Sequence, residues 1–342
     1  MAERVLLTGI SGFIGGHIAL ALLDKGYVVR GSVRSPQKAS EVQETLARHG
    51  ADVTRLELVT LDLLRDDGWT AAMAEVSHLV HSASPFFVEE PKDRMELIRP
   101  AVEGTERALR AALAAGVGRI VLTSSVAAIS YGHDREMKRP FTEADWTRLG
   151  GPGVSAYTES KTRAEQAAWA LVDEAGRRND MAVINPALVL GPLLDKDPGT
   201  SAGLVLRLLD GSIPALPDFS FGLVDVRDVP ALHVSALISP AAGGRRHIAS
   251  NGTFGLAEIA QMLREGLEPT ATRRLPRLRA PDWAMRLYAL IDSELRGTLH
   301  ELGHRRLFDN TVGEKLLGRP FTPAHDAVLA TARSFREQGL LG

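Results

Sequence analysis

Short apolar runs alternate with longer amphipathic segments through the first 190 residues. The runs are apolar at nearly every position, which is typical of parallel strands covered by helices on both faces. Such alternation predicts βαβ units with right-handed crossovers. The predicted strands are Arg4–Thr8, Val28–Val33, Leu56–Thr60, His78–Ser82, Arg119–Ser124 and Met181–Pro186. The predicted helices are Phe13–Lys25, Lys38–His49, Asp66–Ala74, Ile98–Ala115 and Ala156–Arg177, with Gly26 and Gly116 as helix stops.

The pattern changes after residue 186. Residues 191–218 are rich in Pro and Gly, 224–238 have a helix-like pattern, and 247–249 predict one more strand. Residues 254–342 are helical, more basic and punctuated by Pro. We therefore predict a doubly wound parallel α/β (Rossmann) domain from residues 1–186 and about 224–249. A smaller, mainly helical substrate lobe would comprise residues 187–223 and 250–342.

Composition narrows the class of protein. The chain has 342 residues, 44% hydrophobic and 24% charged, with a net charge of −2 and no Cys. Near-neutral charge predicts neither a nucleic-acid partner nor an anionic membrane surface. No apolar run approaches the roughly 18 to 20 residues of a membrane span, and no signal peptide precedes Val5. The lack of Cys excludes disulfides and thiolate chemistry and fits the reducing cytoplasm, where we expect the protein to lie. We further expect a monomer or homodimer with a small-molecule substrate.

A glycine-rich turn follows the first predicted strand. The sequence TGISGFIG places three glycines three residues apart, directly before a helical pattern. Glycines permit a tight turn and close approach of the backbone to a pyrophosphate, and the helix N-terminus supplies free N–H groups. At a strand-to-helix switch this motif predicts a dinucleotide site. Its residues are Gly9, Ser11, Gly12, Phe13, Ile14 and Gly15.

The end of the second predicted strand indicates which dinucleotide binds. NAD sites usually place an acidic residue there, but residues 27–40 contain no Asp or Glu. Arg34 and Lys38 follow the strand instead, and both can pair with a 2′-phosphate. We therefore predict NADP(H). After the third strand, Asp62 and Leu63 are expected to hold the adenine.

A catalytic arrangement is predicted downstream. Tyr157 and Lys161 in YTESK are four residues apart, so they lie on one face of a helix. An ammonium beside a phenol favours the phenolate and should lower the pKa of Tyr157. Ser125, at the end of the fifth strand, is placed to hydrogen-bond a substrate carbonyl and the alkoxide that forms from it.

On these residues the chain resembles the extended short-chain dehydrogenases/reductases. Within them it is similar to the dihydroflavonol reductase-like and yeast methylglyoxal/aldehyde reductase-like branch. The resemblance spans nearly the whole chain. It rests on TGISGFIGGH, VRSPQK, LDLL, HSASPF, PAVEGT, VLTSSVAA, YTESK, INPALVLGP, VDVRDVPALH and LLGRPFTP.

The resemblance implies roles for particular residues. Ser125, Tyr157 and Lys161 would form the catalytic triad, and Ala83 and Ser84 would line the cofactor cleft. Pro186, Ala187, Leu188 and Val189 would pack beside the nicotinamide carboxamide. Two departures stand out: residues 98–105 lack the Asn that many relatives use for proton relay, and the cinnamoyl-CoA reductase motif is missing. Water or other groups would then complete the relay.

The substrate pocket is expected to be mostly apolar. Its walls would come from Ser84, Phe86, Val126, Leu188 and the variable stretch 214–221. An apolar wall favours aliphatic or aromatic ketones and aldehydes over nucleotide sugars.

The chain also contains HELGH at residues 300–304, which matches the zinc motif HExxH. Gly303 lies inside the would-be helix and two arginines follow it, which is a poor setting for a second cation. We expect solvated or loop histidines and no metal site.

Three functional classes fit the sequence. The favoured class is an NADPH-dependent carbonyl reductase, a ketone/aldehyde reductase that acts through Tyr157. A nucleotide-sugar epimerase or dehydratase on the same scaffold would usually retain NAD, and Arg34 argues against it. A non-catalytic NADP-binding regulatory protein would have no reason to keep Ser125, Tyr157 and Lys161 together.

Overall fold

The computed structural model describes residues 3–85, 91, 93–135, 137, 139–290 and 299–341. Its centre is a seven-stranded parallel sheet of order β3-β2-β1-β4-β5-β6-β9. The strands are β1 Arg4–Thr8, β2 Val28–Val33, β3 Leu56–Thr60, β4 His78–His81, β5 Arg119–Thr123, β6 Met181–Pro186 and β9 Arg245–Ala249. The order reverses between β1 and β4, which is where open α/β sheets bind ligands. The predicted doubly wound fold is confirmed.

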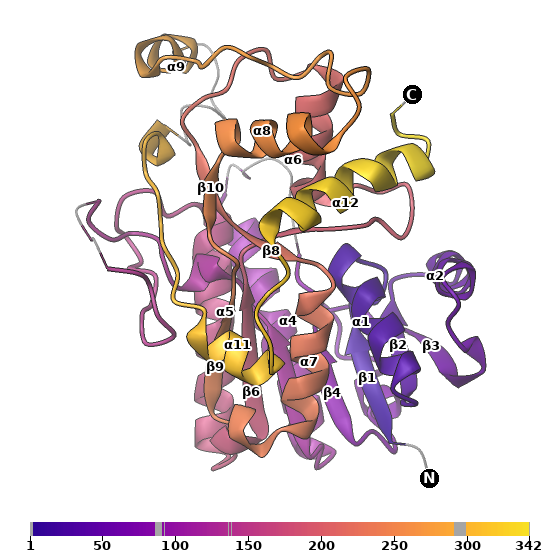
Figure 1. Cartoon of the computed structure of the whole chain (residues 1–342). Coiled ribbons are helices and arrows are strands. Elements are labelled where there is room, and N and C mark those ends of the chain that lie inside the picture. The colour runs from indigo at the N-terminus through magenta and orange to yellow at the C-terminus, as the bar shows by residue number, and fades with distance from the viewer. Residues whose placement is uncertain are drawn as a thin grey trace.

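Helices cover both faces of this sheet (Figure 1). One face carries α1 Phe13–Asp24, α2 Pro36–Arg48 and α7 Asp228–Ile238, and the other carries α3 Trp69–Ala72, α4 Met95–Ala114 and α5 Ala156–Glu174. Side chains on β1 alternate between these layers, since Val5 and Leu7 pack under α1 while Leu6 packs under α4. All three are fully buried, as the uniformly apolar strand pattern predicts.

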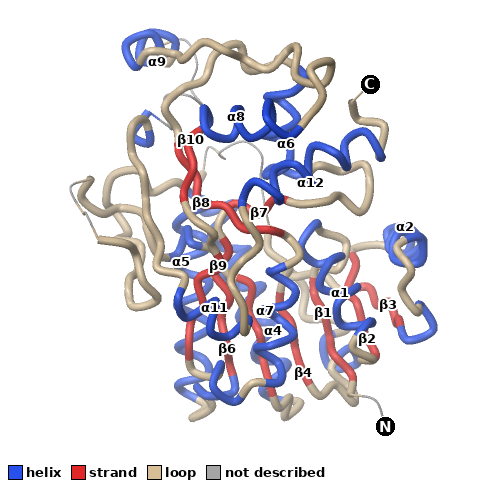
Figure 2. Tube along the Cα trace, in the orientation of Figure 1, coloured by secondary structure: helices blue, strands red, loops and turns tan. Residues whose placement is uncertain are grey.

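A second, smaller group of elements lies beyond the carboxyl ends of the strands (Figures 1 and 2). Its three-stranded sheet has the order β10-β8-β7, from β7 Leu188–Leu190, β8 Ser220–Asp225 and β10 Thr253–Gly255. Besides α7, the described helices after β7 are α6 Gly199–Asp210, α8 Leu256–Gly266, α9 Asp282–Tyr288, α11 Thr311–Leu317 and α12 Ala324–Glu337. A separate apolar cluster joins α6, α8 and α12, while α11 returns to pack on α7 and β9.

Short 3-10 turns link several elements. They are η1 Val53–Arg55, η2 Val126–Ala128, η3 Arg178–Asp180, η4 Pro240–Ala242 and η5 Leu299–Glu301.

Most predicted elements of the first 190 residues agree with the structure to within a few residues. Gly26 and Gly116 do end helices, in the left-handed conformation at φ 86° and 70°. The helix-like pattern over 224–238 was wrong at its start, because residues 220–225 form β8 and the helix begins only at Asp228. Asp225 accepts a hydrogen bond from the backbone N–H of Arg227, which turns the chain between the two elements.

The Pro- and Gly-rich residues 191–218 also contain a helix that their composition does not predict. Helix α6 forms within them, starting after Pro198 and ending at Gly211, whose φ is 87°. The proposed bounds of the two lobes stay a prediction, although β9 completes the large sheet.

Candidate active site

The glycine turn is built by close backbone packing at the end of β1. Gly9 has φ +73°, and a Cβ there would lie 2.8 Å from the backbone of Ala83. A Cβ on Gly15 would lie 2.0 Å from the Gly9 carbonyl oxygen. Neither position can carry a side chain, so the turn requires glycine for packing as well as for conformation.

The first turn of α1 leaves its N–H groups available. Gly12 is the exposed N-cap residue, and no side chain caps the helix. A Cβ on Gly12 would meet nothing closer than 3.5 Å, so this face is open, unlike Gly9 and Gly15. Ser11, Phe13 and Ile14 are half-buried around it. Uncapped N–H groups beside open backbone fit the pyrophosphate of a dinucleotide.

The two cations after β2 differ in their surroundings. Arg34 is exposed and makes no hydrogen bond or ion pair with any described residue. Lys38 lies on the first turn of α2 and pairs with Glu41 at 2.9 Å, which raises the pKa of Lys38. A hollow of about 70 Å³ joins Lys38 to the glycine turn at Ser11, Gly12 and Phe13. The structure thus brings Lys38 beside the turn and leaves Arg34 free to bind an anion.

Four more predicted cofactor residues lie at the ends of β3 and β4. Asp62 is exposed, and its carboxylate accepts from the backbone N–H of Leu64 at 2.9 Å. The Leu63 carbonyl accepts from Arg107 on α4. Ala83 donates its N–H to the Thr8 hydroxyl at 3.2 Å and closes over the glycine turn. Ser84 follows it, half-buried.

Ser125, Tyr157 and Lys161 come together as predicted from β5 and α5. Ser125 is the N-cap of η2, its oxygen accepting from Ala127 N–H at 3.1 Å. Its hydroxyl also hydrogen-bonds the Tyr157 side chain. The Lys161 Nζ lies 5.9 Å from the centre of the Tyr157 ring. The hydroxyl, the phenol and the ammonium therefore form one cluster beyond the end of β5.

The electrostatics of this cluster differ in part from the prediction. Burial raises the pKa of Tyr157, and the hydrogen bond from Ser125 opposes that rise only partly. Burial lowers the pKa of Lys161 to about 8, while the Glu165 carboxylate acts to raise it. Tyr157 is therefore protonated, and Lys161 is not among the groups that shift its pKa, contrary to the expected lowering by Lys161.

Comparison with known proteins identifies the family. The model of the NAD dependent epimerase/dehydratase family matches residues 5–249. The chain belongs to that family. A cinnamoyl-CoA reductase of Medicago truncatula is 32% identical over 347 residues, spanning 99% of this chain and 97% of the relative. An oxidoreductase of Schizosaccharomyces pombe is 38% identical over 279 residues, spanning 77% of this chain and 82% of the relative.

Solved structures agree with this family assignment. Yeast methylglyoxal/isovaleraldehyde reductase, determined in complex with NADPH, has a TM-score of 0.81 and 27% identity, with coverage of 98% of this chain and 99% of the yeast chain. The predicted resemblance to extended short-chain dehydrogenases/reductases is confirmed. This member of the epimerase/dehydratase family is an enzyme of the oxidoreductase class.

The residues predicted to flank the nicotinamide and the substrate occupy β6, β7 and η2. Pro186 ends β6, and its carbonyl accepts from the Ser125 hydroxyl at 3.4 Å. Ala187 and Val189 are buried, whereas Leu188 and Val126 are half-buried. Ser84 is half-buried as well, and Phe86 lies outside the described residues.

A buried network behind Lys161 was not predicted. The Glu165 carboxylate accepts from the side chains of Ser124 (2.6 Å), Asn185 (2.8 Å), Trp169 (3.2 Å) and Arg246 (2.6 Å). It thus connects α5 to β5, β6 and β9 beneath the Ser125–Tyr157–Lys161 cluster. One signal was present in the sequence, because Glu165 follows Lys161 by four residues and shares its helix face.

His81 is a second residue that the sequence analysis did not single out. It is buried, and its Nδ1 lies 2.8 Å from the Thr8 hydroxyl. Burial lowers the pKa of His81 to about 3, and the charge on Lys161 acts in the same direction. His81 is therefore neutral beside Lys161.

The helix that HExxH would need does not form. His300 and Glu301 belong to the short turn η5, which ends before Gly303 at φ +69° and His304. The Glu301 carboxylate pairs with Arg306. No cluster of metal-ligating side chains occurs among the described residues, and no described helix is long and apolar enough to cross a membrane.

Proposed function

We propose that this enzyme is an NADPH-dependent carbonyl reductase that converts ketones or aldehydes to alcohols. The observation that carries the proposal is the Ser125–Tyr157–Lys161 cluster at the carboxyl end of β5, on the same edge of the sheet as the glycine turn. Carboxyl ends of neighbouring parallel strands meet at one edge, so a dinucleotide on the turn would extend toward these three residues.

The chain's own residues account for the proton and for orientation. When bound, the reduced nicotinamide supplies a hydride to the carbonyl carbon. Tyr157 carries its proton, because burial raises its pKa, and donates it to the carbonyl oxygen. Ser125 donates a hydrogen bond to that oxygen as negative charge develops. The Lys161 ammonium would stabilise the resulting phenolate and would hold the nicotinamide ribose of a bound cofactor.

NADPH is favoured over NADH by the residues after β2. Arg34 is an exposed guanidinium that forms no ion pair with a described residue, Lys38 follows it by four residues, and residues 27–40 carry no carboxylate to hold the ribose hydroxyls. The yeast neighbour complexed with NADPH supports the same choice. We further propose that residues 1–186 and about 224–249 bind the dinucleotide while the remainder forms the substrate lobe.

The proposed reaction is tested by NADPH oxidation against a panel of aldehydes, ketones, diketones and flavonoid-like carbonyls, with NADH in parallel. We expect turnover on several carbonyls, with a higher kcat/KM for NADPH. Tightly held NAD in the purified protein, without NADPH oxidation on the panel, would indicate an epimerase or dehydratase instead. NADPH binding without turnover on any carbonyl would indicate a regulatory protein.

A further inference from the structure

A cavity of about 560 Å³ lies in the smaller group of elements, where α6, α8 and α12 pack together in the upper part of Figure 1. Three segments line it: the end of α6 at Leu209 and Asp210, residues 267–274 after α8, and the end of α12 with Leu341. No residue proposed for the cofactor, the substrate or the catalytic cluster is among the described residues that line it. Its volume is typical of small-molecule sites, which measure about 300–1,000 Å³.

Four arginines line this cavity from two sides. Arg273 and Arg274 come from the loop after α8, whereas Arg333 and Arg336 come from α12. Because Arg333 and Arg336 are three residues apart, one face of α12 carries both. All four residues are exposed, and no guanidinium of the four makes a hydrogen bond or an ion pair with a described residue. Their donors are therefore available to a ligand in the cavity.

The charges around the cavity do not cancel. Asp210 is the one carboxylate among the described residues that line it, and one oxygen of this carboxylate accepts from the Ser212 N–H at 2.7 Å. The C-terminal ends of α6 and α12 also lie at the cavity, and each adds about half a negative charge. Asp210 and the two helix ends thus neutralise only half of the guanidinium charge, so about two positive charges are left.

The floor of the cavity is apolar. Leu209 and Ala332 are each 3% exposed, and Leu267 and Leu341 are half-buried beside them. All four belong to, or pack against, the apolar cluster that joins α6, α8 and α12. Exposed cations above a buried apolar floor are complementary to a ligand that has an anionic group on a small hydrocarbon part.

The loop that carries Arg273 and Arg274 is held in place by backbone contacts. Within it, the Leu275 N–H donates to the Thr272 carbonyl at 3.1 Å and closes a turn. The loop also packs against the end of α6, because a Cβ on Gly211 would lie 3.3 Å from the Arg274 Cβ. This wall of the cavity is therefore formed before any ligand binds, which lowers the entropy cost of binding.

We propose that this cavity binds a phosphate monoester whose organic part is small and apolar. A phosphate monoester carries about 1.5 to 2 negative charges at pH 7, which matches the surplus of positive charge. Its three terminal oxygens accept from several guanidinium groups at once, whereas a carboxylate offers one charge and two oxygens. A bound ligand would connect α6, the loop after α8 and α12, and would thereby stabilise the fold. The site does not depend on the carbonyl reductase function.

Isothermal titration calorimetry with phenyl phosphate tests the site. The double change Arg274→Gln with Arg333→Gln removes two charges and keeps most of each side chain. It should weaken binding at least about tenfold, the value of one charge-assisted hydrogen bond. The matched control is Arg207→Gln, because Arg207 is exposed on α6 but does not line the cavity. Arg34→Ala is a second control, which keeps the proposed cofactor site out of the result. Both controls should bind phenyl phosphate as the parent does.

Two further ligands test the charge and the floor separately. Benzoate has one charge fewer, and inorganic phosphate lacks the ring, so each should bind at least about tenfold more weakly than phenyl phosphate, a difference of about 1.4 kcal/mol. The phosphate ester should also raise the melting temperature of the parent but not of the double variant.

Equal affinity of the parent and the double variant overturns the site, as does a loss in Arg207→Gln as large as in the double variant. Either result would assign the binding to the general positive charge of this surface. A parent that does not bind phenyl phosphate overturns the small-molecule ligand. Sedimentation with vesicles of phosphatidylcholine, with and without phosphatidate, then distinguishes the source of the phosphate. Binding to phosphatidate vesicles that the double variant loses would assign the arginines to a lipid headgroup instead.

Discussion

Lys161 and Glu165 occupy successive turns of α5, and the Glu165 carboxylate acts to raise the pKa of Lys161, which burial lowers to about 8. The ammonium also faces Tyr157 on its own helix and the neutral His81 on β4, while Arg246 from β9 pairs with Glu165. Lys161 can stabilise a phenolate only while it is protonated. Activity should therefore fall as the pH rises through about 8.

Glu165→Gln should move this alkaline loss of activity to lower pH. Removing the carboxylate takes away the charge that favours the ammonium, so the pKa of Lys161 falls further. The measurement is the pH profile of kcat/KM. The variant should also lose stability, by about 3–5 kcal/mol, because Arg246 is left without its buried partner.

A control variant separates the electrostatic effect of Glu165 on Lys161 from its contribution to the stability of the fold. Asp228 is another buried carboxylate, paired with Arg319 and Thr322 away from the catalytic cluster. Asp228→Asn should cost comparable stability and leave the alkaline limb where it is in the parent. Equal profiles for Glu165→Gln and the parent would show that Glu165 has a structural role only.

Cofactor preference should depend on the two cations after β2. Arg34→Ala is expected to raise the KM for NADPH at least tenfold, on the order of one charge-assisted hydrogen bond, and to change the KM for NADH little. Arg48→Ala, an exposed change farther along α2, serves as the control. An unchanged NADPH/NADH ratio in Arg34→Ala would place the phosphate elsewhere.

Lys38 pairs with Glu41, and in the proposed cofactor site a 2′-phosphate would compete with Glu41 for the Lys38 ammonium. Glu41→Gln frees Lys38 and should therefore lower the KM for NADPH without a matching fall for NADH. Steady-state titration of both dinucleotides checks this. A KM for NADPH that rises instead would mean that Glu41 orders Lys38 for binding.

Acid should destabilise the fold through its buried histidines. Burial lowers the pKa of both His17 and His233 to about 4, so the folded chain keeps them neutral. Between pH 4 and the ordinary value of 6.5 the unfolded chain binds more protons, so stability is fully present above 6.5 and is lost as the pH falls toward 4. Urea unfolding measured between about pH 7.5 and pH 5 should show this decline in the free energy of unfolding. This range spans about 6.5, the pKa of a histidine in the unfolded chain.

His233→Gln should make the decline shallower. His233 bridges Thr123 on β5 and the Val229 carbonyl on α7, both at 2.7 Å, and its replacement removes one group that the unfolded chain protonates. The control is His325→Gln, because the His325 side chain is 45% exposed. It should not change how steeply the free energy of unfolding falls with pH. Identical slopes in His233→Gln and the parent would assign the acid sensitivity to other groups.

The proximity of Ser125, Tyr157 and Lys161 and the large sheet were predictable because each depends on local patterns. Uniformly apolar strands, the glycine turn and the spacing of Tyr157 and Lys161 are all encoded within short windows. The ranges for β1, β2, β3 and β6 match the structure at both ends. These short patterns predict each element correctly even though the strands that pair in the sheet come from distant parts of the chain.

Other features depend on contacts between distant segments, and no short window reveals them. Arg246 follows a helix by several residues and reaches Glu165 only because β9 pairs with β6. Arg306 meets Tyr131 across more than half of the chain's length. Strand β8 was missed because its residues resemble a helix pattern that continues into α7.

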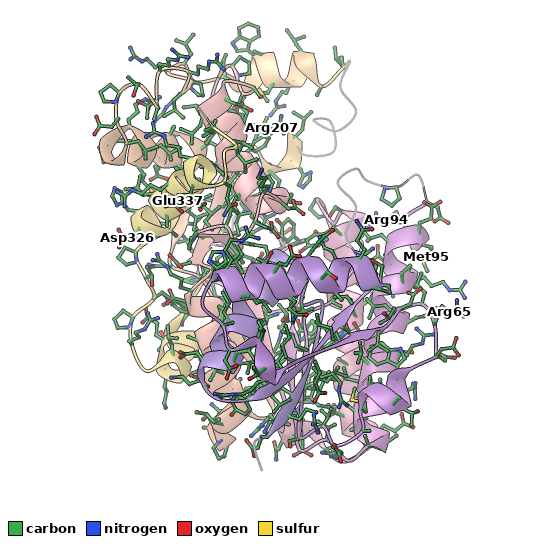
Figure 3. The ribbon with its side chains drawn as sticks, turned by 90° about the vertical axis from the view of Figure 1, so that its right-hand side faces the viewer. Arg65, Arg94, Met95, Arg207, Asp326 and Glu337 are labelled. Atoms are coloured by element: carbon green, nitrogen blue, oxygen red, sulfur yellow. The ribbon has the colours of Figure 1, made fainter. Side chains whose placement is uncertain are left out.

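An exposed ion pair also joins the start of α4 to α5. Figure 3 shows Arg94 and Met95 at the start of α4, apart from Arg207 on α6 and Glu337 on α12. Arg94 pairs with Glu159 at 2.8 Å, two residues beyond Tyr157 on α5. Such an exposed pair contributes little stability, so the position of Tyr157 depends on the buried network instead.

Turnover by Tyr157→Phe, measured as NADPH oxidation on the best carbonyl of the panel alongside NADPH binding by fluorescence, tests the central claim most directly. The change removes one hydroxyl and keeps the ring. We expect unchanged NADPH affinity and a loss of kcat of at least about a hundredfold, the usual contribution of a general acid. Turnover equal to that of the parent at saturating NADPH would contradict it.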